Sequence, residues 1–537
     1  MQLIKDITKE KLRGAFYTPP DIADFILKWA LRDNANRDIL EPSCGDGVFL
    51  NQIKAAGYPY NSIYAIELDE KESAKAKAIK LKKCTVETKE FHKFCNTTNK
   101  RFDLVIGNPP FIRYQYFNKT QQHEASVIFD RADLKYSKLT NSWVSFIVGS
   151  SLLLKESGKI GFVVPAEILQ VSFAQALRKY LANFYNKIII VSFEKLVFPD
   201  IQQEVVLLLC EKDLTNKHFI EHIEVRDMQS LTRLDIKKIS TPQKHIDFNS
   251  NKWTFYFLDQ KEIDFIERVK ADTRLKRFGQ LAKVEVGITT GANPFFTVPL
   301  STVRLYRLEK FSRPMVGRSV QVSSAVFKKA DWQKNLTSGT RANLLVFPPM
   351  NKLNGHKGVR DYLAYGKSFG IHKGYKCGIR DEWQIVPSLW APDALFLRRN
   401  SLYPKFLINE IGAYTTDTMH RVKINEGINK QALVASYYNS LSLAFTEICG
   451  RSHGGGVLEL MPNEVENIVI PYDKNNAELL SEIDSRLRSK QGIRDILKFT
   501  DNKILKERYG FSSSDIQMAN QIWEKLSRRR MSRGKQR

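Results

Sequence analysis

The sequence lacks paired cysteines, a secretory leader and any long apolar run. Its six cysteines are scattered without a CxxC pair, so neither a disulfide framework nor a zinc ribbon is indicated, and a reducing compartment is favoured. No apolar core follows the N-terminus, and the longest loosely apolar stretch, residues 144–154, is far shorter than the roughly 20 residues that cross a membrane. These absences predict a soluble, cytoplasmic protein with no membrane partner.

Acidic residues are few relative to basic ones. The chain has 83 lysines and arginines against 58 aspartates and glutamates, a net charge of +25. Residues 251–537 carry +19 of this excess, and residues 1–250 carry only +6. A field of this strength predicts an acidic polymer as partner, most commonly nucleic acid. The basic run at residues 525–537 is either part of that surface or a solvated tail.

The length of 537 residues exceeds the roughly 250 to 300 at which one core usually stops growing, so two domains are expected. Between residues 38 and 210, β-rich runs alternate with helical stretches, which predicts a mainly parallel sheet covered by helices. The runs at 187–193 and 204–210 are joined by a short loop and should pair antiparallel. We therefore predict an α/β domain over residues 1–240 and a mixed α+β domain over residues 241–537.

A glycine loop follows the first predicted strand, at residues 41–50 (EPSCGDGVFL). Ligands of open α/β sheets bind at the carboxyl ends of strands, and Gly45 and Gly47 let the backbone come close to one. The loop has neither the GxGxxG of dinucleotide binding nor the Gly-Lys-Ser/Thr of a phosphate loop, so a cofactor without a pyrophosphate is indicated. Glu67, at the end of the next predicted strand, is placed to accept two hydrogen bonds from a ribose diol.

A stiff tetrapeptide follows a later predicted strand, at Asn108, Pro109, Pro110 and Phe111. The two prolines fix the backbone and remove two donors, which leaves the Asn108 amide oxygen and the Pro109 carbonyl as rigid acceptors. Such a pair suits a planar amino group, because holding both hydrogens frees the nitrogen lone pair from the ring while Phe111 stacks on it. The exocyclic amine of a base flipped out of a helix fits this description.

Taken in order, these segments resemble a known family. They are similar to the gamma-class (TaqI-type) adenine-N6 DNA methyltransferases of type II restriction-modification systems, which use S-adenosylmethionine. The resemblance covers roughly residues 12–210, and its specificity comes from the order of the motifs. The segments that carry it are residues 14–20 (GAFYTPP), 39–50 (ILEPSCGDGVFL), 64–70 (YAIELDE), 103–111 (DLVIGNPPF) and 161–169 (GFVVPAEIL).

The resemblance implies a Rossmann-like, mainly parallel, seven-stranded sheet of the class I methyltransferase type, followed by a DNA target-recognition domain with a basic helical C-terminal tail. It also implies that one adenine is flipped into the Asn108 pocket, where its N6 attacks the methyl group of the cofactor. The residues that it assigns to S-adenosylmethionine are Thr18, Glu41, Ser43, Gly45 and Gly47 at the methionine end, Glu67 at the ribose, and Glu90 and Phe91 beside the adenine ring. The residues that it assigns to the target base are Asn108, Pro109, Pro110 and Phe111, with Phe198 as a second aromatic.

The resemblance also implies partners for the chain. The substrate would be a specific sequence of double-stranded DNA, protected in the host from a separately encoded restriction endonuclease, and the enzyme would be a monomer. Residues 286–293 and 451–460 are similar to segments of the recognition domain, although the glycines at 454–456 fit a flexible loop equally well. Charge and loop placement nominate four residues for reading bases, Lys376, Arg380, Arg398 and Arg399.

Two motifs of the sequence are also found in enzymes of other classes. His218 and His222 match the HxxEH string of inverted zinc proteases, but the residues around them alternate as in a strand, which separates the two imidazoles, so no metal site is predicted. An NPP turn also serves methyltransferases of protein glutamine and of guanine amines in RNA. The basic half argues against a protein substrate, whereas RNA stays open. The intact Asn108 and glycine loop argue against a binding protein without activity.

Overall fold

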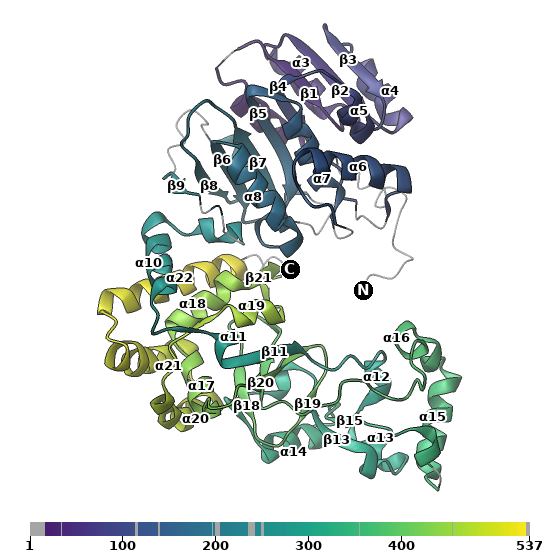
Figure 1. Ribbon diagram of the computed structural model, residues 1–537, viewed down its shortest axis with the longest axis vertical. Coiled ribbons are helices and arrows are strands. Elements are labelled where there is room, and N and C mark those ends of the chain that lie inside the picture. Colours follow the sequence, from purple (N-terminus) through teal and green to yellow (C-terminus); the bar gives the residue numbers. More distant parts are fainter. Residues whose placement is uncertain are drawn as a thin grey trace. The chain divides into compact units, whose positions relative to one another are not determined.

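The chain divides into two compact units, residues 1–263 (unit 1) and 264–537 (unit 2) (Figure 1). The domain boundary predicted near residue 240 falls in residues 235–241, outside the described part of the chain. Within the described ranges, no helix is long and apolar enough to cross a membrane. The computed structural model describes residues 17–33, 35–112, 116–137, 140–195, 197–198, 204–234, 242–246, 248, 252–353, 355–453 and 455–532.

Unit 1 is built around one large, mostly parallel sheet (Figure 1). Among the described residues the sheet has nine strands, in the order β3-β2-β1-β4-β5-β7-β6-β8-β9. The strands from β3 to β5 in this order run parallel, and β7 lies antiparallel between β5 and β6. The strands are β1 Asp38–Glu41, β2 Ser62–Glu67, β3 Cys84–Thr88, β4 Phe102–Gly107, β5 Leu154–Pro165, β6 Lys187–Phe193, β7 Val205–Glu211, β8 Phe219–Val225 and β9 Lys244–His245.

The predicted mainly parallel sheet is confirmed, but its number of strands differs from the prediction. The mainly parallel arrangement is present, and β6 and β7 pair antiparallel as expected. The sheet of the described residues exceeds the seven strands expected, because β8 adds in parallel to β6 and β9 follows antiparallel. The HFIEH string lies in β8 except for its first residue, His218, so the alternation of its residues correctly predicted a strand.

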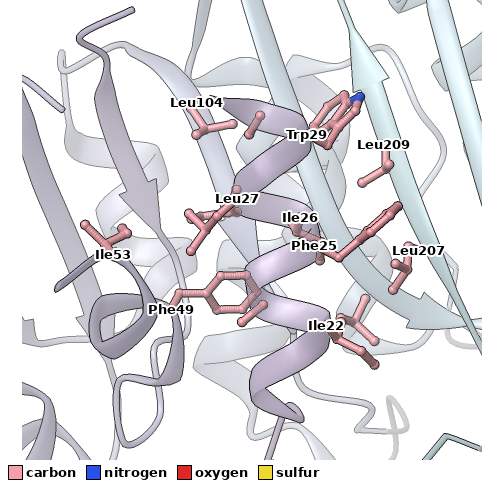
Figure 2. Close-up of a cluster of buried hydrophobic side chains, with 14 of the residues drawn as sticks. Ile22, Phe25, Ile26, Leu27, Trp29, Phe49, Ile53, Leu104, Leu207 and Leu209 are labelled. Carbon is pink, nitrogen blue, oxygen red and sulfur yellow. The ribbon is translucent and has the colours of Figure 1, made fainter. Parts of the chain in front are cut away.

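Helices alternate with the strands of unit 1, and α2 Pro20–Ala30 packs its apolar face on the sheet (Figure 2). Pro20 occupies the first helical position, where the N–H that proline lacks would have no helical partner. Phe25 and Trp29 are buried, each contributing about 1.5–3 kcal/mol or more. Gly161 of β5 permits the close approach, since a Cβ there would lie 2.7 Å from Ile26 Cγ2. The other helices are α3 Val48–Ala56, α4 Glu70–Ala78, α5 Phe91–Thr97, α6 Lys119–Arg131, α7 Ser142–Leu152, η3 Ala166–Leu169, η4 Ser172–Ala174, α8 Gln175–Phe184, α9 Met228–Thr232 and η5 Trp253–Phe257.

Unit 2 mixes short strands with helices, as predicted for this part of the chain. Its described strands form sheets in the orders β11-β20-β16-β18-β14, β12-β15-β13-β19, β17-β22-β21 and β10-β23. Their bounds are β10 Lys276–Arg277, β11 Ala282–Val286, β12 Thr297–Val298, β13 Ser312–Val316, β14 Val326–Phe327, β15 Asn343–Leu345, β16 Ala394–Leu397, β17 Arg399–Asn400, β18 Phe406–Asn409, β19 Tyr414–Thr415, β20 Met419–Ile424, β21 Arg451–His453, β22 Val457–Glu459 and β23 Val469–Ile470.

Helices of unit 2 lie between and after these strands. α10 Gln260–Ala271 spans the junction of the two units. The helices that follow it are α11 Phe278–Leu281, α12 Asn293–Phe296, α13 Leu300–Leu305, η6 Glu309–Phe311, η7 Ser319–Gln321, α14 Lys329–Thr337, η8 Met350–Lys352, α15 Lys357–Ser368, η9 Ile371–Lys373, α16 Tyr375–Gly378, α17 Lys430–Tyr437, α18 Ser440–Cys449, α19 Pro462–Glu466, η10 Lys474–Leu479, α20 Leu480–Arg488, α21 Ile493–Thr500, η11 Asp501–Arg508 and α22 Ser513–Ser532.

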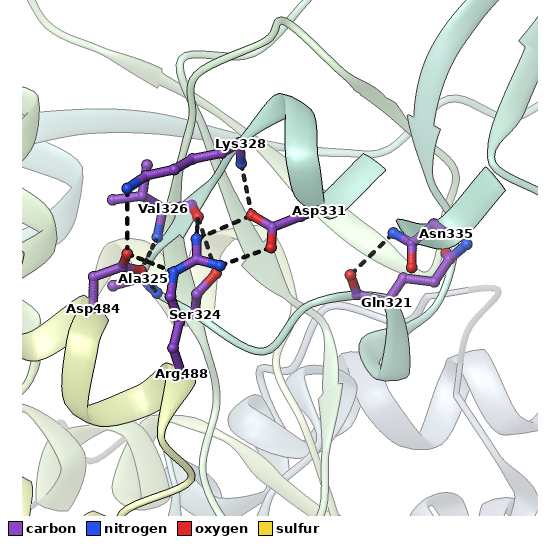
Figure 3. Close-up of polar contacts among 9 residues, drawn as sticks. All are labelled: Gln321, Ser324, Ala325, Val326, Lys328, Asp331, Asn335, Asp484 and Arg488. Atoms are coloured by element: carbon purple, nitrogen blue, oxygen red, sulfur yellow. Dashed lines mark hydrogen bonds and ion pairs between the residues drawn. The ribbon is translucent and has the colours of Figure 1, made fainter. Parts of the chain in front are cut away.

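An ion network joins β14, α14 and α20 (Figure 3). Arg488 of α20 donates to both carboxylate oxygens of Asp331, at 2.7 and 3.0 Å, and to Asp484 at 2.8 Å. Asp484 in turn accepts hydrogen bonds from the backbone N–H groups of Ala325 and Val326, at 2.9 and 3.0 Å. These charges compensate one another, so this part of the basic unit 2 is not a free cationic surface.

A buried ion pair anchors the basic C-terminal helix. The predicted helical tail is present as α22, which ends at Ser532, and residues 533–537 lie outside the described ranges. Arg530 of this helix is buried and donates to both carboxylate oxygens of Glu447 in α18, at 3.0 and 2.6 Å. Arg528 is exposed and pairs with Glu524 in the same helix. The basic run is therefore partly a structural anchor.

We expect Arg530→Ala to lower the free energy of unfolding by about 3–5 kcal/mol, because it leaves the Glu447 carboxylate buried without its partner. Arg528→Ala removes an exposed pair from the same helix and should cost less than about 1 kcal/mol. Urea unfolding of the full chain measures both effects. Equal losses from the two substitutions would contradict the anchoring role.

Candidate active site

The carboxyl ends of β1 and β4 define the candidate site. β1 pairs in parallel with β2 on one side and with β4 on the other, so the strand order reverses between β1 and β4. Ligands of open α/β sheets bind outside the carboxyl ends of the strands at such a reversal. The glycine loop follows β1, the tetrapeptide at 108–111 follows β4, and the Ser43 hydroxyl donates to the Asn108 carbonyl at 3.3 Å. The structure thus brings the two predicted corners together.

The glycine loop is held against the end of β2 by its own backbone. The Gly45 N–H donates to one carboxylate oxygen of Glu67 at 2.8 Å, and Gly45 adopts a left-handed conformation with a φ of 55°. Gly47 precedes α3 with a φ of 88°, and a Cβ there would lie 2.5 Å from Ile79 Cδ1. A side chain at Gly47 would therefore push the loop away from α4, so the sequence requires glycine at this position.

Glu67 has a positioning role in addition to the one predicted. Its second carboxylate oxygen accepts a hydrogen bond from the Asp69 N–H at 2.8 Å, next to the N-cap of α4. Each carboxylate oxygen offers two lone pairs, so Glu67 can hold the loop and still accept bonds from a ligand. Its contact with a ribose stays a prediction.

Glu41 is a buried carboxyl group with an unsatisfied oxygen. It ends β1 with 2% of its surface exposed, and its Oε2 has no hydrogen-bond partner among the described residues. Burial raises the pKa of Glu41 well above its ordinary value, and the negative charges of Glu67 and Asp46 raise the pKa further. Burying such a group without a partner costs stability, which makes it a candidate to receive a cation or an N–H donor of a ligand.

Hydrogen bonds from α7 hold the backbone next to the corner formed by Asn108 and Pro109. Ser142, the first residue of that helix, donates its hydroxyl to the Pro110 carbonyl and accepts from the Ile112 N–H at 2.9 Å. The Ser142 N–H also donates to the Ile112 carbonyl at 2.9 Å. These bonds fix the backbone on the far side of the prolines, so the Asn108 side chain and Pro109 carbonyl start from a rigid base. Sequence reasoning missed Ser142.

Phe111 and Phe198 share one apolar environment in unit 1. Phe198 is buried, at 4% exposure, within the main core cluster, and the half-buried Phe111 packs against the same cluster. Phe198 precedes residues 199–203, which lie outside the described part of the chain. The stacking of either ring on a base stays a prediction.

Glu90 caps a helix that begins beside the same sheet edge. It follows β3, and its Oε2 accepts from the Lys93 N–H of α5 at 2.8 Å while Oε1 hydrogen-bonds the His92 ring at 2.5 Å. Burial raises the pKa of Glu90, but the hydrogen bond with His92 and the helix N–H groups outweigh it and leave the pKa lowered. Phe91 is buried and stacks on Phe146 at 4.6 Å. Both residues have structural roles, and their contact with a cofactor stays a prediction.

The remaining predicted residue of the site, Thr18, is buried and lies just before α2. Residues 14–16 of the segment GAFYTPP lie outside the described ranges, as does Gly454 of the predicted glycine loop in unit 2. Thr18 is therefore a buried hydroxyl two residues before α2, and both its place in the site and its contact with a methionine moiety stay predictions.

Three of the four basic residues nominated for reading bases are engaged inside unit 2. Arg380 donates to two backbone carbonyls in the loop that precedes α12, at 3.2 and 2.8 Å. Arg398 and Arg399 both pair with Glu459, at 2.9 and 3.0 Å. Lys376 is exposed. Arg399 donates to Glu459 through Nε and keeps 67% of its side chain exposed, so Arg399 and Lys376 are the best placed of the four to contact DNA.

Two protein-family models match the chain. Residues 31–198 match the Eco57I restriction-modification methylase, and residues 250–505 match the C-terminal domain of the type II methyltransferase M.Eco57I. Together these ranges span more than half of the sequence and include both units. Both models describe methyltransferases of restriction-modification systems.

The similar proteins with names are type II methyltransferases. The type II methyltransferase M.AccI of Acinetobacter calcoaceticus is 26% identical over 475 residues, which are 84% of this chain and 84% of that protein. The type II methyltransferase M.HindII of Haemophilus influenzae is 25% identical over 74% of each chain. The DrdV–DNA complex, a solved structure, has a TM-score of 0.47 at 12% identity over 82% of this chain and 53% of that one, too low to support an argument. Both units thus match models of Eco57I-like type II restriction-modification methyltransferases, which supports the predicted resemblance at this level.

We expect Glu41→Gln to stabilise the ligand-free chain at neutral pH. Because the pKa of Glu41 is raised in the folded state, this group contributes its full stability below the unfolded pKa and loses it as the pH rises through the folded pKa. The variant should therefore melt about 2 °C or more above the wild type at neutral pH and close to it near pH 4. Thermal unfolding across this range tests the prediction, with the exposed Glu156→Gln as control. A lower melting temperature at neutral pH would contradict the unfavourable burial.

Proposed function

We propose that this chain transfers a methyl group from S-adenosylmethionine to the N6 amine of an adenine in a specific duplex DNA sequence. The observation that carries the proposal is the junction at the sheet edge, where Ser43 of the glycine loop donates to the backbone of Asn108. The site proposed for the methyl donor and the site proposed to hold the amino group are thereby adjacent. Together with the matches to methyltransferase family models, this arrangement supports an amino-methyltransferase of the gamma class.

The chemistry of the glycine loop fits the methyl donor. The unsatisfied oxygen of Glu41 suits the ammonium group of a methionine moiety, and the carboxylates of Glu67 and Asp46 add a negative field that favours a cationic ligand. Bound S-adenosylmethionine supplies an electrophilic methyl group. The residues that would hold it are Thr18, Glu41, Ser43, Gly45, Gly47 and Glu67, with Glu90 and Phe91 near its adenine ring.

The Asn108 corner would hold and orient the target amine. The Asn108 side-chain oxygen and the Pro109 carbonyl each accept one hydrogen of the amino group, which directs the nitrogen lone pair out of conjugation with the ring. Pro110, held by Ser142, fixes the spacing of the two acceptors, while Phe111 and Phe198 offer aromatic faces to the base. Because geometry activates the nitrogen, its proton can leave after transfer and no strong general base is required.

Unit 2 would deliver the DNA. Residues 251–537 carry a net charge of +19, which suits contacts to phosphates, and an adenine must leave the helix to reach the Asn108 corner. The family match to type II restriction-modification methyltransferases favours DNA over the RNA and protein substrates considered from the sequence. Methylation would then protect host DNA from a companion endonuclease of the same specificity.

Asn108→Ala should lower methyl transfer to duplex DNA by about 100-fold or more, because one of the two amine acceptors is removed. Binding of S-adenosylmethionine should be retained, since the donor side of the site is untouched. Asn51→Ala, at an exposed position of α3, is the matched control and should transfer at the wild-type rate.

The measurement is transfer of labelled methyl groups to duplex DNA, followed by digestion to nucleosides. The expected product is N6-methyladenine. Full activity of Asn108→Ala would refute the acceptor role, and label in cytosine would refute the adenine substrate.

A further inference from the structure

One segment of unit 2 runs from α15 through η9 to α16 (Figure 1). Large apolar side chains are exposed along it. Tyr375 is 82% exposed, Phe369 70% and Ile379 68%. Three such side chains so close in sequence differ from the singly scattered apolar residues of an ordinary surface and indicate an interaction site. We call the surface formed by Lys367, Phe369, Lys373, Tyr375, Lys376 and Ile379 the aromatic-basic surface.

The aromatic-basic surface stands on a firmly packed base. Tyr362 of α15 is buried, stacks on Phe295 at 4.6 Å and donates its hydroxyl to the Phe295 carbonyl at 2.7 Å. A Cβ at Gly366 would lie 2.6 Å from the Phe295 ring, which shows how closely α15 meets α12. Cys377, within α16, is buried. The exposed side chains are therefore presented by an ordered support, which lowers the entropy lost when they bind a partner.

The cations of this segment are free to act on an external anion. Five of them are exposed, and none of the five forms an ion pair within the part of the chain that the structure describes. Some exposed lysines elsewhere in unit 2 do form ion pairs, for example Lys283 with Glu285 and Lys503 with Glu507. Residues 357–380 contain one acidic residue, Asp361. The five unpaired cations are Lys357, Arg360, Lys367, Lys373 and Lys376.

Nucleic acid offers the chemistry that matches this surface. Its phosphates attract unpaired lysines, and its sugars and bases provide flat apolar faces for exposed aromatic rings. We propose that the aromatic-basic surface contacts duplex DNA, with Lys373 and Lys376 on phosphates and with Tyr375 and Phe369 against sugars or an opened base step. The proposal deepens the proposed function and rests on it for the identity of the nucleic acid.

The test compares two double variants that remove the same charge. Lys373→Gln/Lys376→Gln removes two charges from the aromatic-basic surface. The control, Lys283→Gln/Lys503→Gln, removes two charges from paired lysines elsewhere in unit 2. Affinity for a fluorescent duplex is measured by anisotropy over a series of salt concentrations. The surface variant should bind about tenfold more weakly and lose about two from the slope of log affinity against log salt, while the control keeps the wild-type slope.

Tyr375→Ala separates the aromatic contribution from the charge. It should weaken DNA binding about fivefold or more without changing the salt slope, whereas Tyr375→Phe should bind like the wild type. Tyr375 is exposed, so both variants should retain the wild-type melting temperature. The Lys283→Gln/Lys503→Gln control should transfer methyl groups at the wild-type rate, with an unchanged KM for DNA.

Several outcomes would overturn the proposal. Unchanged affinity and salt slope in Lys373→Gln/Lys376→Gln would show that this surface does not meet DNA. Loss of binding to anionic phospholipid vesicles, with DNA binding intact, would assign the surface to lipid instead. These results differ from failure of the proposed function, in which the wild-type chain binds duplex DNA through this surface but transfers no methyl group to it.

Discussion

The parallel pairing of β1 with β4 is the contact on which the candidate site depends. Ile39 lies opposite Leu104 and Leu40 opposite Val105, so the strands that carry the two corners end at the same edge of the sheet. A slip of one residue would turn the side chains of one strand to the other face and separate the corners. The bond from Ser43 to the Asn108 carbonyl then joins loops whose distance the sheet has already set.

Around this junction several local features lower stability or restrict the sequence, as expected for the proposed binding site. The carboxyl group of Glu41 is buried at the end of a strand, where an apolar residue would pack without penalty. The neighbouring loop requires glycine at 47, and the corner at 108–110 requires a serine from another helix to hold it. Consistent local patterns elsewhere in unit 1 stabilise the fold, so these exceptions mark the part of the sheet that serves a ligand.

The elements that local pattern determines could be predicted from the sequence. The strand at residues 187–193 has the predicted bounds, and both corners could be assigned to one edge because parallel strands place their carboxyl ends together. Ser142 could not be found, since its hydroxyl reaches back 32 residues to a carbonyl that no periodicity identifies. Arg530 looked like one of several basic residues in a tail, because its burial depends on Glu447, 83 residues away. The extra strand β8 was recognised as a strand, but its place in the sheet depends on tertiary packing.

We propose that the methyl donor and the target amine meet between Glu41 and Asn108. A crystal structure of the full chain with S-adenosylhomocysteine, the demethylated donor, tests this arrangement most directly. We expect the amino group of the ligand to lie within hydrogen-bond distance of the Glu41 carboxylate and its sulfur to face the Asn108 side chain. A ligand bound at another edge of the sheet, or one whose sulfur points away from Asn108, would contradict this arrangement.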